Sequence, residues 1–101
     1  MKFVVNTCFG GFGLSKEAQA YLDCTEYSYS AECLRNDENL IKCVEELKGK
    51  ASGHFAELHI MYVPDDATDW MITNYDGVEE VLYVLDGKMR YATFDESDWE
   101  E

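Results

Sequence analysis

Two Asp-Gly pairs constrain the fold of this chain more than any other feature. Asp76-Gly77 and Asp86-Gly87 lie ten residues apart, and each stands between two runs of apolar residues. An Asp-Gly pair accommodates the positive φ angles of a type I′ turn, the two-residue loop whose twist matches that of the strands it joins. The two turns therefore predict three consecutive antiparallel strands in a meander.

The first turn also predicts which residues of its two strands face each other. The expected pairs are Tyr75 with Val78, Ile72 with Val81, and Trp70 with Tyr83. The pairs of Ile72 with Val81 and of Trp70 with Tyr83 give the hairpin one apolar face, yet the opposite face is apolar as well. The opposite face carries Met71, Thr73, Tyr75, Leu82 and Val84, and the second hairpin adds Met89 and Tyr91. Because helices easily cover only one side of a small sheet, the second apolar face predicts self-association or a partner interface. The alternative is a curled sheet that buries its own edge.

The segments before the meander add two strands and two helices. Helices are indicated by N-cap residues followed by apolar residues at helical spacing, and strands by short β-rich apolar runs. The predicted elements are a buried central strand over 3–7, a helix from Ser15 to about Leu22, an irregular segment over 23–35, a helix from Asn36 or Asp37 to Gly49 or Gly53, and a strand over 58–62.

Together these elements predict an α+β fold in one small domain. We expect a mostly antiparallel sheet of four to five strands, made from the first strand and a three- to four-strand meander, with the helices on one face. A chain of 101 residues allows one hydrophobic core, so we assign residues 1–94 to a single domain and residues 95–101 to an acidic C-terminal tail.

Composition points to the cytoplasm. Hydrophobic residues make up 47% of the chain, and no apolar run approaches the roughly 20 residues that span a bilayer. The N-terminal residues turn polar too early for a signal peptide. The four cysteines, Cys8, Cys24, Cys33 and Cys43, are expected to be free thiols because no export signal accompanies them. Their spacing fits no zinc motif, so neither a metal site nor a cofactor is predicted.

The net charge of −13 is concentrated in the second half of the chain. Residues 57–101 contain thirteen acidic and two basic residues, whereas residues 1–56 contain eight and six. Direct nucleic-acid binding is not expected, because contacts to phosphates need clustered Lys and Arg. A concentrated negative surface either keeps a protein soluble or binds a basic surface such as a nucleic-acid-binding groove.

The acidic second half is the first candidate site. Its predicted protein-binding residues are Asp65, Asp66, Asp69, Glu79, Glu80, Asp95, Glu96 and Asp98, with Trp99 as an apolar anchor. Residues 94–101 are either a plain acidic tail or an interaction segment around that anchor.

A glycine-rich turn before the first helix is the second candidate site. Such a turn can hold an anion, because backbone N–H groups and the positive end of the helix dipole converge there. The candidate ligand-binding residues are Phe9, Gly10, Gly11, Phe12, Gly13 and Ser15. The turn matches neither of the common phosphate-loop patterns. In the alternative interpretation the glycines only permit positive φ angles, while Phe9 and Phe12 pack into the core.

No catalytic residue is predicted. Cys8 lies near a helix N-terminus, where thiols can be activated, but no base stands next to it in the sequence. A cysteine phosphatase would need an arginine six residues later, where Leu14 stands. No set of acid, base, nucleophile or metal ligands can be assembled, so we expect binding rather than catalysis.

Residues 5–15, with the sequence VNTCFGGFGLS, resemble the opening of a family of small phage and prophage proteins. The resemblance continues through residues 35–37, 44–47, 56–60, 64–65 and 75–79, whereas residues 27–30 and the acidic ending depart from it. In size and charge the chain resembles phage-borne inhibitors of bacterial defence such as anti-CRISPR proteins. The resemblance implies a non-enzymatic protein in the bacterial cytoplasm, whose acidic surface occupies a basic nucleic-acid-binding site of a host defence protein. The alternatives are a sponge that sequesters a signalling nucleotide at the glycine turn, and a homo-oligomeric phage structural or assembly protein.

Overall fold

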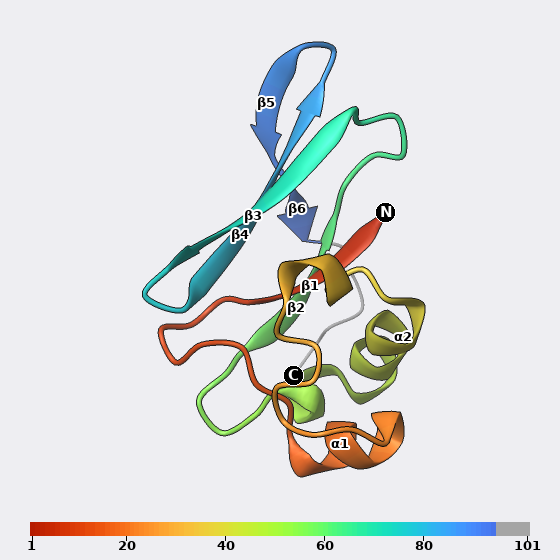
Figure 1. Ribbon diagram of the computed structural model, residues 1–101, viewed down its shortest axis with the longest axis vertical. Helices are drawn as coiled ribbons and strands as arrows, with labels where there is room; N and C mark the ends of the chain where they lie inside the picture. Colours follow the sequence, from red (N-terminus) through yellow and green to blue (C-terminus); the bar gives the residue numbers. More distant parts are fainter. Residues whose placement is uncertain (95–101) are drawn as a thin grey trace.

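The structure has three layers (Figure 1). The helices form one outer layer, a first β-sheet forms the middle layer, and a second β-sheet forms the other outer layer. The computed structural model describes residues 1–94. Their elements are, in chain order, β1 (Lys2–Asn6), α1 (Lys16–Leu22), the 3-10 helix η1 (Glu32–Leu34), α2 (Glu38–Leu47), the 3-10 helix η2 (Lys48–Ala51), β2 (Leu58–Tyr62), β3 (Asp69–Tyr75), β4 (Val78–Leu85), β5 (Lys88–Tyr91) and β6 (Thr93–Phe94). Within these residues the strands form two antiparallel three-stranded sheets, in the orders β1-β2-β6 and β3-β4-β5. The predicted α+β class is confirmed.

Both α-helices begin at the predicted N-cap residues. The Ser15 hydroxyl accepts a hydrogen bond at 3.1 Å from the backbone N–H three residues later, and the Asp37 carboxylate accepts two from the first turn of α2. These bonds satisfy N–H groups that lack a partner in the first turn of a helix. α2 continues as η2, which ends between the two glycines at which the helix was predicted to stop. No helix in the described part of the chain is long and apolar enough to cross a membrane.

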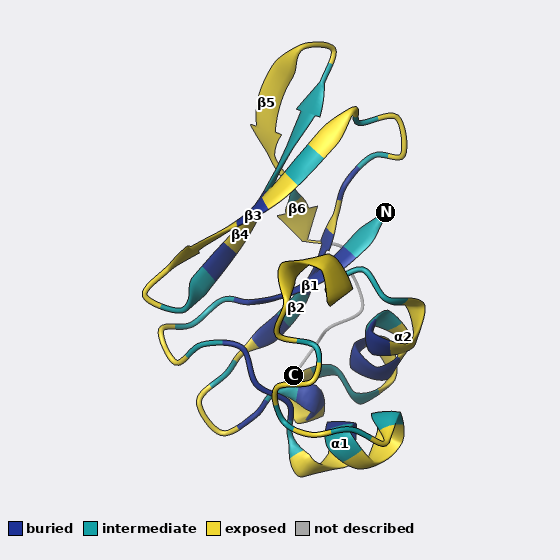
Figure 2. Ribbon diagram, in the orientation of Figure 1, coloured by how far each residue is buried: buried dark blue, intermediate teal, exposed yellow. Residues whose placement is uncertain are grey.

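β1 and β2 are largely buried on both faces because they lie between the other two layers (Figure 2). The core on the helix side includes Val4, Leu14, Leu40, Val44 and Ile60. The core between the two sheets includes Phe3, Val5, Met61, Ile72 and Val81. Successive side chains of a strand point to opposite faces, so β1 contributes to both cores.

The prediction of one sheet with four to five strands is wrong, because the meander forms a separate sheet. Both faces of β1 and β2 are apolar, and the helices cover only one of them. The connection over residues 63–68 carries the chain across the other face, where the inner side of the meander covers it. Face-to-face packing removes more apolar surface from water than extending one sheet at its edge. β6 then returns to pair with β2 as an additional strand.

The prediction that the first strand is central in its sheet is also wrong. Within residues 1–94, β1 pairs with β2 alone and lies at the sheet edge. Its burial comes from the layers on either side, and the outward N–H groups of Val4 and Asn6 are bonded to residues outside the sheet.

The predicted turns and register of the meander are confirmed. Asp76 and Gly77 have φ angles of 54° and 92°, and Asp86 and Gly87 have 53° and 75°. Positive φ at both central residues is what a type I′ turn requires. The observed pairs include Tyr75 with Val78, Ile72 with Val81 and Trp70 with Tyr83. The β4–β5 hairpin projects at one end of the molecule, whose principal extents are 41 × 27 × 25 Å (Figure 1).

Candidate functional site

The face of the second sheet that points away from the first sheet carries several exposed large apolar side chains. This outer face consists of Asp69, Met71, Thr73 and Tyr75 of β3, Val78, Glu80, Leu82 and Val84 of β4, and Met89 and Tyr91 of β5. Tyr75 is 76% exposed, Tyr91 64% and Met89 60%. Figure 2 shows exposed residues along both edge strands of this sheet. Large apolar side chains gathered on an exposed face are typical of an interaction surface.

A shallow hollow lies on the outer face. Its volume is about 80 Å³, and it is lined by Asp69, Trp70, Met71, Leu82, Tyr83, Val84 and Met89. Pockets for small molecules measure roughly 300–1,000 Å³. The hollow is therefore suited to one or two side chains of a protein partner rather than to a whole ligand.

Four of the predicted acidic binding residues are exposed, two of them on the outer face. They are Asp65 and Asp66, in the connection before β3, and Asp69 and Glu80, on the face itself. The Asp65 carboxylate lies 2.7 Å from the N-terminal ammonium group, which compensates part of its charge. The other predicted members, Asp95, Glu96, Asp98 and Trp99, lie outside the described residues.

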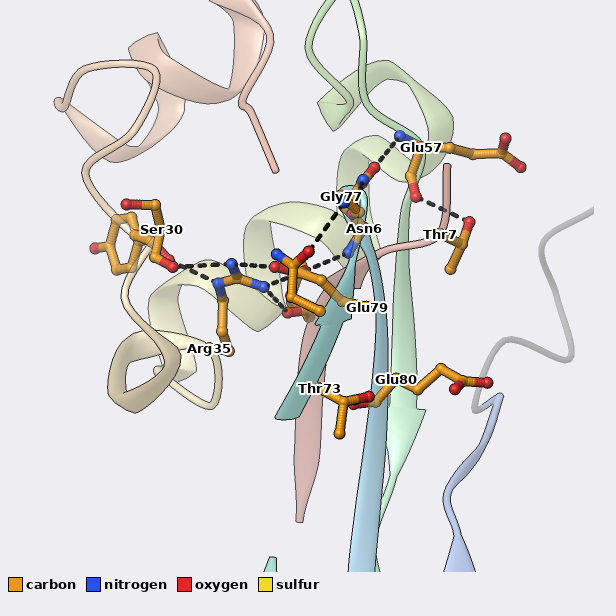
Figure 3. Close-up of polar contacts among 12 residues, drawn as sticks. Asn6, Thr7, Ser30, Arg35, Glu57, Thr73, Gly77, Glu79 and Glu80 are labelled. Atoms are coloured by element: carbon orange, nitrogen blue, oxygen red, sulfur yellow. Dashed lines mark hydrogen bonds and ion pairs between the residues drawn. The ribbon is translucent and has the colours of Figure 1, made fainter. Parts of the chain in front are cut away.

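Glu79 does not belong to this acidic surface, although it was predicted there. It is 3% exposed, and its carboxylate forms a bidentate ion pair with Arg35, which is 2% exposed (Figure 3). The pairing of Nη2 with Oε2 measures 2.7 Å. The physical reason is the register, which turns Glu79 to the same inner side of β4 as Val81. A buried carboxylate is tolerated there only with a charged or hydrogen-bonding partner.

Arg35 is the centre of a buried polar network that the sequence analysis missed. Its guanidinium also donates hydrogen bonds of 2.8 to 3.3 Å to the backbone carbonyls of Val4, Tyr29 and Ser30. The same group stacks on the ring of Phe12, 4.0 Å from the ring centroid. Because the donors of a guanidinium point in fixed directions, this network sets the position of the irregular segment 23–35 against β1 and β4.

The network also closes the outer edge of β1. Every second residue of an antiparallel edge strand turns its backbone groups away from the neighbouring strand. The N–H of Val4 donates to the Arg35 carbonyl at 2.9 Å, and the N–H of Asn6 donates to Glu79 Oε1 at 2.8 Å. The ion pair therefore takes the place of a neighbouring strand and protects this edge from pairing with another chain.

Asn6 ties β1 to the loops around it. Its Nδ2 donates to the carbonyls of Cys8 and Gly77 at 2.6 and 2.7 Å, and its Oδ1 accepts from the N–H of Glu57 at 2.7 Å (Figure 3). The polar residues buried within residues 1–94 are Asn6, Arg35 and Glu79. No buried side-chain nitrogen or oxygen in that part of the chain lacks a partner. A network in which every member is bonded stabilises a fold and leaves no group for a ligand.

The glycine turn packs closely against neighbouring backbone. A Cβ atom added at Gly10 would lie 1.6 Å from the carbonyl oxygen of Phe55. The Ser15 hydroxyl donates to the Lys50 carbonyl at 2.6 Å while it caps α1, and the N–H groups of residues 14 and 15 donate to the carbonyls of Glu26 and Ala51. Several of the groups that would bind an anion are thus already bonded. Gly11, with φ of 91°, needs the conformational freedom of glycine.

A second hollow, of about 40 Å³, lies beside this turn. It is lined by Gly10, Gly11, Phe12, Gly13, Glu26, Tyr27, Phe55 and Ala56, none of which is basic. Phe12 is buried, whereas Phe9, Tyr27 and Phe55 are 75%, 62% and 71% exposed. The prediction that Phe9 packs into the core is therefore wrong, because Phe9 extends from the turn into solvent. The glycine turn lies among exposed aromatic rings but offers a phosphate no cation from this lining.

The cysteines Cys8, Cys24, Cys33 and Cys43 are free thiols in the structure. Burial in the core raises the pKa of Cys43 to about 11, and the nearby Cys24 and Glu46 add to the increase. Sγ of Cys8 lies 3.2 Å from the carbonyl oxygen of Phe55, an acceptor rather than a base. Within residues 1–94, no three His, Cys, Asp or Glu side chains gather as a metal site would require.

Compared with protein-family models, curated proteins and solved structures, the chain has no significant match. The resemblance to phage proteins therefore stays a prediction based on the residues quoted above.

Proposed function

We propose that this protein inhibits a bacterial antiviral defence system by binding a protein effector at its basic nucleic-acid-binding site. The contact surface is the outer face together with Asp65 and Asp66. The observation that carries the proposal is the combination of exposed carboxylates and exposed large apolar side chains on this surface, whose members include no basic residue.

The two kinds of side chain would contribute differently to binding. A groove that holds nucleic acid is lined with Lys and Arg, which attract anions from solution. Carboxylates of a protein can displace these anions, as the phosphates of nucleic acid do. Charged groups at the rim of an interface mainly raise the association rate and contribute to the choice of partner. Exposed aromatic and methionine side chains supply most of the affinity once water is excluded from them.

The basic residues of the second half do not cancel this charge pattern. Lys88 and Arg90 lie on β5 opposite Leu85 and Tyr83, so they turn to the inner side of the sheet. The outer face of the same hairpin carries Met89 and Tyr91. The negative potential of the outer face therefore remains uncompensated by side chains of its own surface.

A pair of shape-conserving substitutions tests the proposal. Asp66→Asn with Glu80→Gln removes two exposed charges and leaves the fold's buried contacts in place. The assay is competition between the protein and fluorescent target nucleic acid on purified CRISPR effector complexes, over about 50 to 300 mM salt. We expect competitive inhibition that weakens steeply with salt, and about tenfold weaker inhibition by the variant, equivalent to about 1.4 kcal/mol.

The matched control is Glu17→Gln with Glu38→Gln, which makes the same change of net charge at exposed positions on the helices. This control should inhibit as the unmodified protein does. Equal weakening by both variants would mean that total charge matters rather than this surface. Inhibition that does not compete with nucleic acid, or that does not respond to salt, would contradict the proposal.

A nucleotide-binding sponge is the second candidate function. The exposed rings of Phe9, Tyr27 and Phe55 near the glycine turn favour it, because aromatic side chains stack on nucleobases. The carboxylate of Glu26 in the lining and the lack of a basic lining residue oppose the phosphate contact. Thermal denaturation with cyclic di- and oligonucleotides tests this function, since a ligand at 100 times its Kd adds about 2.7 kcal/mol of stability. If a nucleotide stabilises the protein and Tyr27→Ala abolishes that stabilisation, the nucleotide-binding function would be favoured over the inhibitor proposal.

A phage structural or assembly protein is the third alternative from the sequence. It would require a large, stable homo-oligomer built on the exposed apolar face. Sedimentation velocity distinguishes such an assembly from a small binding protein.

A further inference from the structure

The two sheets formed by residues 1–94 have four outer edges, and three of them are protected. The edge of β1 is closed by Arg35 and Glu79. β6 has only two residues, and β5 has four, of which Lys88 and Arg90 are charged. Short edge strands and basic side chains are common devices against unwanted strand pairing.

The edge of β3 has none of these devices. β3 is seven residues long, DWMITNY, with no proline, lysine or arginine and one acidic residue at its start. Tyr75 and Val78 flank the type I′ turn, so alternate residues of β3 bond to β4 and the others point outward. The outward groups include the N–H of Ile72 and Asn74 and the carbonyls of Trp70 and Ile72. Among the described residues, no hydrogen bond to another element uses these groups.

We propose that two copies of the chain pair through this edge, β3 against β3, around a two-fold axis at Ile72. The antiparallel pairing joins the two second sheets into one six-stranded sheet. Ile72 of each copy exchanges two hydrogen bonds with Ile72 of the other, and each Asn74 N–H donates to the Trp70 carbonyl of the other copy. The N–H of Trp70 takes no part, because it already donates to Asp69 Oδ1 at 2.8 Å.

The charge pattern of β3 favours a second copy as the occupant. The two-fold axis places Asp69 opposite Tyr75 and Met71 opposite Thr73, so no like charges face each other although each chain carries −13. Face-to-face packing of two outer faces would instead press Asp69 and Glu80 of both copies into an apolar contact, which disfavours that arrangement. Edge pairing keeps these carboxylates in water and brings two outer faces side by side.

Hydrogen exchange measured by NMR on the full chain, at several protein concentrations, tests the pairing without any substitution. The amides of Ile72 and Asn74 should exchange freely in the monomer and become protected as the concentration rises, together with a doubling of mass in sedimentation velocity. The outward amides of Met89 and Tyr91 on the β5 edge should stay unprotected. A monomer at all concentrations, or a dimer that protects Met89 and Tyr91 instead, would overturn the proposal.

Two variants of one residue separate the edge from the fold. Asn74 Oδ1 accepts a hydrogen bond from Gly77 N–H in the turn, and both Asn74→Pro and Asn74→Ala lose it. Only proline also removes the outward N–H, which an edge strand tolerates. We expect Asn74→Pro to lose dimerisation by at least tenfold in Kd, while Asn74→Ala dimerises as the unmodified chain does. Equal dimerisation by the two variants would refute pairing through this edge, and this result is independent of any inhibitory activity.

Discussion

Replacing Arg35 with methionine should destabilise the protein more than any substitution of an exposed charge. The change removes the bidentate pairing with Glu79 and three bonds to backbone carbonyls, and leaves the carboxylate buried with one donor from Asn6. Breaking a buried ion pair by removing one partner costs about 3 to 5 kcal/mol. Methionine keeps the unbranched stem of the side chain but lacks the guanidinium that stacks on the ring of Phe12, so a cavity adds to this cost. For a domain of this size the loss corresponds to a fall in Tm of roughly 15 to 30 °C.

Urea denaturation followed by far-UV circular dichroism measures this loss directly. The control is Arg90→Met, the same substitution at an exposed position on β5, which should change the free energy of unfolding by less than about 0.5 kcal/mol. The double variant Arg35→Met with Glu79→Met should recover much of the stability, because no charge is then left unpaired in the core. A loss below about 1 kcal/mol for Arg35→Met, or a double variant no more stable than the single one, would refute the reasoning.

Three further predictions concern the glycine turn, the core thiol and the outer face. Gly10→Ala should lower the free energy of unfolding by about 1 to 3 kcal/mol, because its Cβ would collide with the backbone of Phe55. The control Gly49→Ala places its Cβ more than 4 Å from other atoms and should leave the free energy of unfolding unchanged in the same urea assay. Burial raises the pKa of Cys43 from 9.0 to about 11, so the contribution of its protonated thiol to the free energy of unfolding should be complete below pH 9 and should fall as the pH rises to 11. Cys43→Ala should flatten this decline in urea titrations at different pH values. Tyr91→Ala should weaken effector binding through faster dissociation and leave its salt dependence unchanged, as surface plasmon resonance can measure; a changed salt slope would contradict the assignment of that side chain to apolar contact.

Much of the local structure could be predicted because its signals lie within a few residues of each other. The Asp-Gly pairs predicted both hairpins and the register between β3 and β4. The caps Ser15 and Asp37 predicted where α1 and α2 begin, since a capping side chain bonds to N–H groups two or three residues later. The acids at 65, 66, 69 and 80 were predicted to be exposed for the same reason, because turns and outer strand positions are recognisable from the pattern.

The arrangement of the two sheets could not be predicted in this way. Apolar residues on both faces of β1 and β2 indicate burial but not what covers each face. The site prediction failed for Glu79 for a related reason, since its partner Arg35 stands 44 residues earlier in an irregular segment. The predicted register did carry a signal, because it turned Glu79 to the same side as Val81, where an acidic residue calls for a partner.

The sequence by itself determined the turns, the helix starts, the hairpin register and the concentration of negative charge in the second half of the chain. The tertiary structure alone decided that the meander packs face to face on the first sheet, that Arg35 and Glu79 close the edge of β1, and that no other element of residues 1–94 pairs with the outer edge of β3. The physical reason is how far apart in the sequence the interacting residues lie. Turns and caps depend on backbone bonds between near neighbours, whereas layers, buried ion pairs and sheet edges depend on which distant segments exclude water from one another.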